Sequence, residues 1–133
     1  MSDGLSEKKI VPVITAKAPA AIGPYSQGIS AGNHVFVSGQ TPLKADGSLV
    51  TGTVAQQTEQ CLNNVLEVLL GAGLTMDAVV KTTVYMTDLS KFAEMNDVYA
   101  KRFRVPFPAR ATVQVSALPK GAGVEIDAIA VRS

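Results

Sequence analysis

The chain has one cysteine, one histidine and no tryptophan among its 133 residues, and these scarcities exclude several kinds of site. A single cysteine, Cys61, can form neither an internal disulfide nor a zinc site made of thiolates. A single histidine, His34, cannot supply a pair of imidazole ligands to a metal. The sequence also has no glycine-rich phosphate loop and no Ser-His-Asp set. We therefore expect no metal and no cofactor. We interpret Cys61 as a buried structural thiol and His34 as an exposed turn residue.

Charged residues are scarce as well, at 17% of the chain against about 25% in typical soluble domains. Twelve basic and eleven acidic residues give a net charge of +1, which indicates no surface for a polyanion. A hydrophobic content of 47% excludes intrinsic disorder. A small domain exposes much of its surface area to solvent. The small number of charged residues therefore predicts that other copies of the chain cover part of this surface. We expect one domain over residues 1–133, assembled as a homo-oligomer.

The longest stretch without a charged residue, 18–43, is long enough to raise the question of a membrane span. A spanning helix needs about 20 mostly apolar residues, and the prolines and glycines of 18–43 would break it repeatedly. We interpret this segment as strands and turns. The first twenty residues contain Asp3 and Glu7 and lack the apolar core of a signal peptide. These features predict a cytoplasmic protein with no membrane partner.

The pattern of apolar residues predicts an α+β domain, in which one mixed sheet carries two helices on one face. Pro12 interrupts the first β-branched run, so residues 1–16 are interpreted as a lead-in with an edge strand. Gly32-Asn33 predicts a tight hairpin, and Asp46-Gly47 a second turn with a short return strand at Leu49-Val50. Further strands are expected at 26–30, 34–38, 79–87, 110–117 and 124–131, with Val80, Val84 and Met86 on one face of the strand at 79–87.

Two helices are predicted from their start and stop signals. Thr53 and Gln56 form a capping box, in which each side chain satisfies a backbone donor at the start of a helix that ends near Gly71. A second helix is expected from about Ser90, and Pro106 stops it. Its apolar stripe is Phe92, Met95, Tyr99 and Phe103. We interpret the cations at its end as a solvated helix terminus rather than an RNA contact; they are Lys101, Arg102 and Arg104.

Arg110 and Glu125 are the best candidates for chemistry, because each opens one of the last two strands. A planar guanidinium can hold a small carboxylate through two parallel hydrogen bonds. If the two strands pair as a hairpin, Glu125 lies at a similar level to Arg110. The alternative is that they form an ordinary cross-strand ion pair of little energetic value. Burial would raise the pKa of Glu125 and Arg110 would lower it, and the sequence leaves that balance open.

Five motifs stand in order along the chain, and together they resemble the Rid (YjgF) family of reactive-intermediate deaminases, from about Lys17 to Val131. Each motif is weak alone, whereas five at this spacing are specific. They are Ile22-Gly23-Pro24-Tyr25-Ser26-Gln27, Val37-Ser38-Gly39-Gln40, Met95-Asn96-Asp97-Val98-Tyr99, Pro108-Ala109-Arg110 and Val124-Glu125-Ile126-Asp127-Ala128-Ile129-Ala130.

The resemblance implies a chorismate-mutase-like subunit in a homotrimer with ligand clefts between subunits. It implies hydrolysis of 2-imino acids such as 2-iminopropanoate and 2-iminobutanoate, which are in equilibrium with enamines, to 2-oxo acids and ammonia. Arg110 then matches the arginine for the substrate carboxylate, and Glu125 the acid that positions water. The family often has Ser-Cys where this chain has Ala111-Thr112, and Thr112 keeps the carbonyl thought to help hold the water. Positions that match the lining of the cleft are Tyr25, Ser38, Gly39 and Asn96.

Two other classes of function stay open at this point. Some relatives with this fold have lost the activity, which leaves a module that only binds a small oxo or imino acid; the presence of Arg110 argues against it. An RNA-directed or chaperone-like activity has also been attributed to the family. The near-neutral net charge disfavours RNA, because phosphate contacts need clustered cations.

Overall fold

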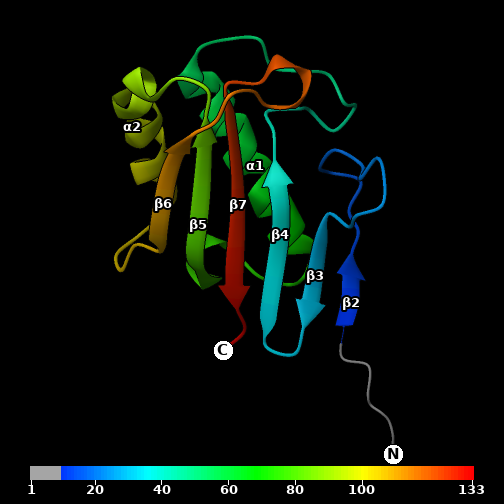
Figure 1. The fold of residues 1–133 in the computed structure, drawn as a ribbon. Helices are drawn as coiled ribbons and strands as arrows, with labels where there is room; N and C mark the ends of the chain where they lie inside the picture. The colour runs from blue at the N-terminus through cyan, green and yellow to red at the C-terminus, as the bar shows by residue number, and fades with distance from the viewer. Residues whose placement is uncertain (1–9) are drawn as a thin grey trace, which may run out of the picture.

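Six strands form one mixed sheet in residues 10–133, the part of the chain that the computed structural model describes (Figure 1). The order is β2-β3-β4-β7-β5-β6, and all neighbours are antiparallel except β5 and β6, which are parallel. Helices α1 and α2 lie on one face, so the predicted α+β architecture is confirmed. The strands are β2 (Ile10–Val13), β3 (Gly28–Ala31), β4 (His34–Gln40), β5 (Val79–Met86), β6 (Ala109–Gln114) and β7 (Val124–Val131).

The turns predicted from glycine form where they were expected. β3 and β4 are joined through Gly32, whose φ of 59° is one that glycine adopts without strain. β2 lies at the sheet edge, where Pro12 is tolerated because a proline has no N–H to donate. Gly47 turns the chain with a φ of 89°, but Leu49 makes only an isolated bridge with Leu43 and no return strand.

Helix α1 (Val54–Gly71) begins at the predicted capping box. The Thr53 hydroxyl accepts from the Gln56 backbone N–H at 3.2 Å, and the Gln56 side chain accepts from the Thr53 N–H at 2.8 Å. The inner face of the helix packs on the sheet, and Cys61 is buried there as predicted, whereas His34 is exposed. Burial of this stripe is the main source of stability in such a domain. It comprises Cys61, Leu62, Val65, Val68 and Leu69.

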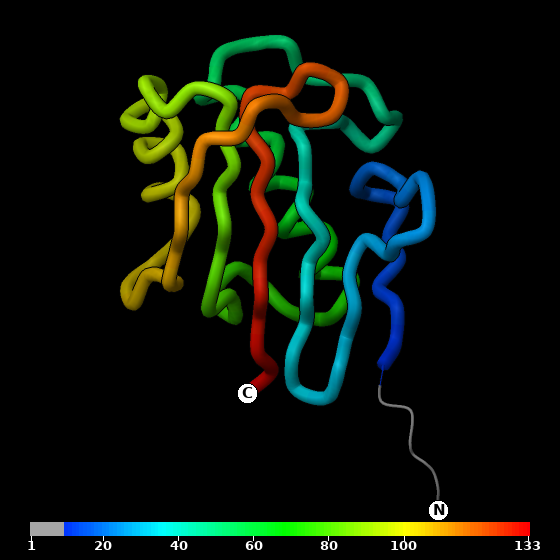
Figure 2. Tube along the Cα trace, in the orientation of Figure 1, coloured from blue at the N-terminus to red at the C-terminus, as the bar shows by residue number. Residues whose placement is uncertain are grey.

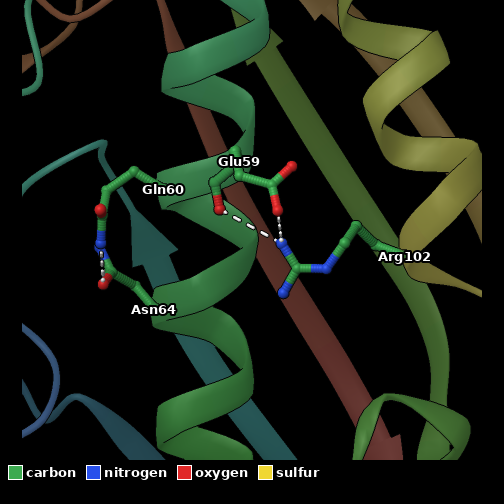
Figure 3. A network of polar contacts seen from close by, with 4 residues as sticks. All are labelled: Glu59, Gln60, Asn64 and Arg102. Atoms are coloured by element: carbon green, nitrogen blue, oxygen red, sulfur yellow. Dashed lines mark hydrogen bonds and ion pairs between the residues drawn. The ribbon is translucent and has the colours of Figure 1, made fainter.

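Helix α2 (Phe92–Arg102) packs beside α1 and follows the short 3₁₀ turn η2 (Leu89–Lys91). Arg102 donates to the Glu59 carboxylate of α1 at 2.8 Å and to the Glu59 backbone carbonyl at 3.4 Å (Figure 3). Arg104 pairs with Asp77 of the 3₁₀ turn η1 (Met76–Ala78). Two of the three cations at the helix end therefore have carboxylate partners.

Asn64 ties α1 to the loop that follows β4. Its buried amide donates to the backbone carbonyls of Thr41 at 3.1 Å and Leu43 at 2.8 Å. Figure 3 shows its other bond, in which the Asn64 side chain accepts from Gln60 at 3.0 Å. This loop and the one before β7, which contains the 3₁₀ turn η3 (Pro119–Gly121), lie at the same end of the sheet (Figure 2). The two loops flank the pocket described below.

The predicted faces of β5 need one correction. Val84 and Met86 are fully buried as expected, but Val80 is 47% exposed. The register between β5 and β7 shifts between Val79 and Lys81, so the inward positions become Val79 and Thr82. A bulge inserts one residue and resets the alternation beyond it.

The larger correction concerns the last two strands, which do not form a hairpin. β5 lies between β6 and β7, and β6 ends at Gln114 rather than continuing to 117. Arg110 is in register with Thr82, which is fully buried under the helices, and Glu125 with Tyr85 on the opposite face. Because paired residues share a face, Arg110 and Glu125 project from opposite faces of the sheet.

The face of the sheet opposite the helices is covered by no helix of residues 10–133 (Figure 1). It exposes apolar side chains as well as polar ones, with Phe36 44% and Val113 40% exposed. Among the described helices, none is long and apolar enough to cross a membrane. The cytoplasmic location expected from composition stays a prediction.

Candidate functional site

Glu125 lies in a pocket of about 660 Å³ that also collects three of the predicted cleft residues, Tyr25, Ser38 and Gly39. We call it the Glu125 pocket. Apolar side chains such as Leu43 complete much of its lining. The pocket forms because β4 and β7 are neighbours and the loops before β3, after β4 and before β7 meet at this end of the sheet.

Hydrogen bonds inside the chain fix the walls of the Glu125 pocket. The buried Gln27 side chain accepts from the Thr15 N–H at 2.8 Å and donates to the Pro19 carbonyl at 2.9 Å, which holds the loop that carries Tyr25. The Ser38 hydroxyl donates to the Ser26 carbonyl at 2.5 Å, and the Ser38 N–H donates to the Gln27 carbonyl at 3.0 Å. Ser38 thus connects β4 to the segment before β3 and also lines the pocket.

Gly39 leaves room for the Glu125 carboxylate. A Cβ at this position would lie 2.0 Å from the Glu125 Oε2 atom and 2.9 Å from its carboxyl carbon. Gly39 stands where the register between β4 and β7 shifts, between Val37 and Gln40. The carboxylate therefore lies directly against the backbone of β4, and a side chain at position 39 would displace it.

Within one chain, the environment of Glu125 shifts the balance that the sequence left open toward a raised pKa. Burial, and then the nearby Asp127 carboxylate, raise the pKa of Glu125 above its usual range. Asp127 accepts from the Tyr85 hydroxyl at 2.9 Å and the Thr83 N–H at 3.1 Å. Arg110 does not lower the pKa of Glu125 within one chain, because it lies on the other face. A carboxyl with a raised pKa is suited to exchange protons with a reacting group.

Arg110 lies in a second, smaller pocket of about 390 Å³, the Arg110 pocket, whose lining includes Asn96, Tyr99 and Phe107. Its Nη1 donates to the Asn96 Oδ1 atom at 2.8 Å. Its Cζ lies 4.6 Å from the centre of the Tyr99 ring and 5.4 Å from that of Phe92. Within residues 10–133, no carboxylate pairs with Arg110. The cation is held by a neutral amide and aromatic faces, and it stays available to an anion.

Thr112 lies two residues beyond Arg110 on β6, but its hydroxyl does not face the Glu125 pocket. The Oγ1 atom is buried and has no hydrogen-bond partner among residues 10–133. The backbone groups of Thr112 have a different orientation, which follows from a neighbouring hydrogen bond. The Val115 N–H donates to the Met86 carbonyl of β5. Because backbone groups alternate along a strand, the N–H and carbonyl of Thr112 point to the free edge of the sheet. The carbonyl of Thr112, and not its hydroxyl, is accessible from that edge.

The predicted site residues therefore fall into two groups that one chain does not unite. Tyr25, Ser38, Gly39 and Glu125 share one pocket, and Asn96 and Arg110 share another. The alternative that Arg110 and Glu125 form a simple ion pair is wrong for the single chain. Within residues 10–133 no cluster of side chains could hold a metal ion.

A family model described as endoribonuclease L-PSP matches residues 15–132. A 2-iminobutanoate/2-iminopropanoate deaminase of Bos taurus is 50% identical over 121 residues, which cover 90% of this chain and 88% of that protein. The chain belongs to the Rid (YjgF) family.

Solved structures of Rid proteins have the same fold. The YjgF gene product of E. coli is 43% identical, with a TM-score of 0.87 over 92% of this chain and 99% of that one. E. coli TdcF with bound serine is 42% identical, with a TM-score of 0.88 and the same coverage. The family prediction made from five sequence motifs is thereby confirmed.

Two residues that contact the Arg110 guanidinium were missed at the level of sequence. Phe92 and Tyr99 were interpreted as members of the apolar stripe of α2, and Tyr99 is indeed buried. Both rings also contact the Arg110 guanidinium. The available signal was their spacing around Asn96, because residues at i, i+4 and i+7 share one face of a helix.

The contact between Gly39 and Glu125 leads to a first prediction. We expect Gly39→Ala to displace the Glu125 carboxylate. If Glu125 acts on the substrate as the sequence predicts, activity toward 2-iminopropanoate should fall by about 10- to 100-fold. Because Gly39 has an ordinary backbone conformation, the fold should survive, which circular dichroism checks. Gly71→Ala, on α1, is the matched control. Unchanged activity of the Gly39 variant would contradict the role given to this contact.

The raised pKa of Glu125 leads to a second prediction, on stability. The unfolded chain loses this proton at lower pH than the folded chain, so the charged Glu125 lowers the free energy of unfolding once the pH exceeds the unfolded pKa. Glu125→Gln removes that charge. The difference in Tm between Glu125→Gln and the parent should be smallest near pH 3, grow as the pH rises through the unfolded and folded pKa values, and then level off.

Calorimetric melting from pH 3 to pH 8 measures this difference. The control is Asp97→Asn, which makes the same carboxyl-to-amide change at an exposed position of α2 outside the Glu125 pocket. A Glu125→Gln variant that loses stability relative to the parent as the pH rises would show that the carboxylate is stabilised, not penalised, by its surroundings.

Proposed function

We propose that this protein hydrolyses 2-imino acids, with 2-iminopropanoate and 2-iminobutanoate as substrates, to 2-oxo acids and ammonia. The observation that carries the proposal is Arg110, a half-buried cation with no carboxylate partner in the described chain. Such a group fits the one feature common to all 2-imino acids, a carboxylate next to the C=N carbon. Relatives named 2-iminobutanoate/2-iminopropanoate deaminase, at 46–50% identity, support the same conclusion.

The complete site is proposed to form between two copies of the chain in a homotrimer. One copy supplies Arg110 and Asn96, and its neighbour supplies Glu125, Tyr25, Ser38 and Gly39. Three observations support this arrangement: the two groups lie on opposite faces of one sheet, β6 is an edge strand, and the other face of the sheet carries exposed apolar side chains. A rotation that places the edge of one subunit against the face of the next closes a ring of this kind.

The proposed mechanism requires few protein groups. A protonated imine is already electrophilic at C2, so the reaction needs no Lewis acid or redox group. Arg110 binds the carboxylate and orients C2. Glu125, with its raised pKa, takes a proton from a water molecule whose oxygen adds to C2. Glu125 then gives that proton to the nitrogen and, as the C–N bond of the carbinolamine breaks, takes the proton of its hydroxyl group, so that ammonia leaves and the carbonyl of the 2-oxo acid forms. The Thr112 carbonyl at the free edge of β6 would accept a hydrogen bond from that water.

An RNA-directed function has less support. Arg102 and Arg104, the cations considered for it, pair with Glu59 and Asp77, and phosphate binding would have to displace these carboxylates. If the protein only bound a ligand, the raised pKa of Glu125 would have no role in its function. Hydrolysis accounts for both pockets.

Loss of Arg110 tests the proposed function directly. We expect Arg110→Met to abolish ammonia release from 2-iminopropanoate generated in situ by a serine dehydratase, because no other cation would orient the carboxylate. Glu125→Gln should lower turnover by about 10²- to 10⁴-fold, the usual value of a general base, while still binding 2-oxobutanoate in calorimetry. Turnover by Arg110→Met at the parental rate would remove the carboxylate-binding role of Arg110.

Mixing the two inactive variants tests whether each site needs two chains. If Arg110 and Glu125 act from different subunits, a one-to-one mixture of Arg110→Met and Glu125→Gln chains should restore about one quarter of the sites. The subunit that supplies Arg110 has an intact arginine in about half of the cases, and the subunit that supplies Glu125 has an intact glutamate in about half. Coexpression, or denaturation and refolding together, allows the chains to exchange. Activity that stays at the level of the separate variants after proven exchange would show that both residues act within one chain.

A further inference from the structure

The guanidinium of Arg110 is placed by a hydrogen bond and a stacked ring that constrain different motions. The ring of Tyr99, 4.6 Å from Cζ, limits the tilt of the guanidinium plane. The bond from Nη1 to Asn96, at 2.8 Å, limits rotation within that plane. Within residues 10–133, the Nε and Nη2 donors of Arg110 have no protein acceptor. They form an edge of the fork that remains open to a carboxylate.

Tyr99 is itself fixed more firmly than Arg110. Its residue is 4% exposed, and its hydroxyl lies 2.7 Å from the Thr82 Oγ1 atom in a buried hydrogen bond. Thr82 is fully buried on β5 and is the register partner of Arg110 on β6. Tyr99 therefore links β5 to the guanidinium: its hydroxyl bonds to Thr82 on β5, and its ring contacts the end of the Arg110 side chain. Breaking a buried hydroxyl pair is costly, so this link is rigid.

We propose that Tyr99, anchored by Thr82, is a positioning residue that orients Arg110 for two-point binding of the substrate carboxylate. The inference rests on the proposed function, and it adds a residue whose role is to hold the Arg110 guanidinium in place. Tyr99 acts through Arg110 alone. Without the ring, the flexible side chain of Arg110 samples other rotamers, and the two open donors no longer meet a carboxylate together.

The test is a double-mutant cycle on the binding of 2-oxobutanoate by calorimetry. We expect Tyr99→Leu to raise the Kd about tenfold, and Tyr99→Phe, which keeps the ring, to raise it about two- to threefold, in line with the size of a buried cation–π contact. In an Arg110→Met background the Tyr99→Leu change should have less than a twofold effect. With 2-iminopropanoate, KM should rise more than kcat falls, because the carboxylate is held in both ground and transition states.

Phe103→Leu is the matched control. Phe103 is buried beside Tyr99, with ring centres 4.6 Å apart, but it has no stacking contact with Arg110. Phe103→Leu should lower Tm much as Tyr99→Leu does and leave the Kd unchanged.

A double variant, Thr82→Val with Tyr99→Phe, removes both hydroxyls and leaves no unpaired group. This double variant should keep most of the parental Tm while still weakening 2-oxobutanoate binding.

Each outcome decides between the two proposals. Equal weakening by Tyr99→Leu and Phe103→Leu, or an effect of Tyr99→Leu that persists without Arg110, would overturn the positioning role and leave the function standing. Binding with the expected pattern but no imine hydrolysis would overturn the function and keep the positioning role. A parent protein that binds no 2-oxobutanoate would overturn both.

Discussion

The structure depends on the insertion of β5 between β6 and β7. This single topological fact sends Arg110 and Glu125 to opposite faces of the sheet. Neighbouring strands would have let the two side chains meet as an ion pair, which would occupy the guanidinium and lower the pKa of the carboxyl. Their separation keeps the cation without a partner in the described chain and the pKa of Glu125 raised. Both properties fit the proposed hydrolysis of imines.

The fold supports each group with a buried polar side chain from another element. On the Glu125 side, Gln27 holds the loop of Tyr25, and Asn64 holds the loop that follows β4. On the Arg110 side, the buried hydroxyl pair of Tyr99 and Thr82 serves the same purpose. These amides and hydroxyls make their hydrogen bonds within the chain, so their burial stiffens the walls of the pockets without leaving unpaired groups.

Local signals in the sequence predicted local structure correctly, and the failures concern contacts between distant segments. The capping box of Thr53 and the hairpin at Gly32 depend on residues a few positions apart, and both form. The pairing of β6 was wrong because sequence proximity to β7 suggested a hairpin. A stronger signal was present: a strand, a helix and a strand in succession, β5-α2-β6, favour a parallel pair. The exposure of Val80 follows from a bulge, which no pattern in a single strand reveals.

Assembly would place Arg110 of one subunit near Glu125 of another, and the substrate then decides how strongly they interact. In an empty cleft, the guanidinium would counteract the burial that raises the pKa of Glu125. A bound carboxylate neutralises that guanidinium, so burial and Asp127 again control the carboxyl. The pKa of Glu125 would therefore rise as a substrate carboxylate binds, and the base would gain proton affinity in the occupied cleft. The separation of the two charges within each chain makes this coupling possible, because neither group pairs with an oppositely charged side chain in its own described subunit.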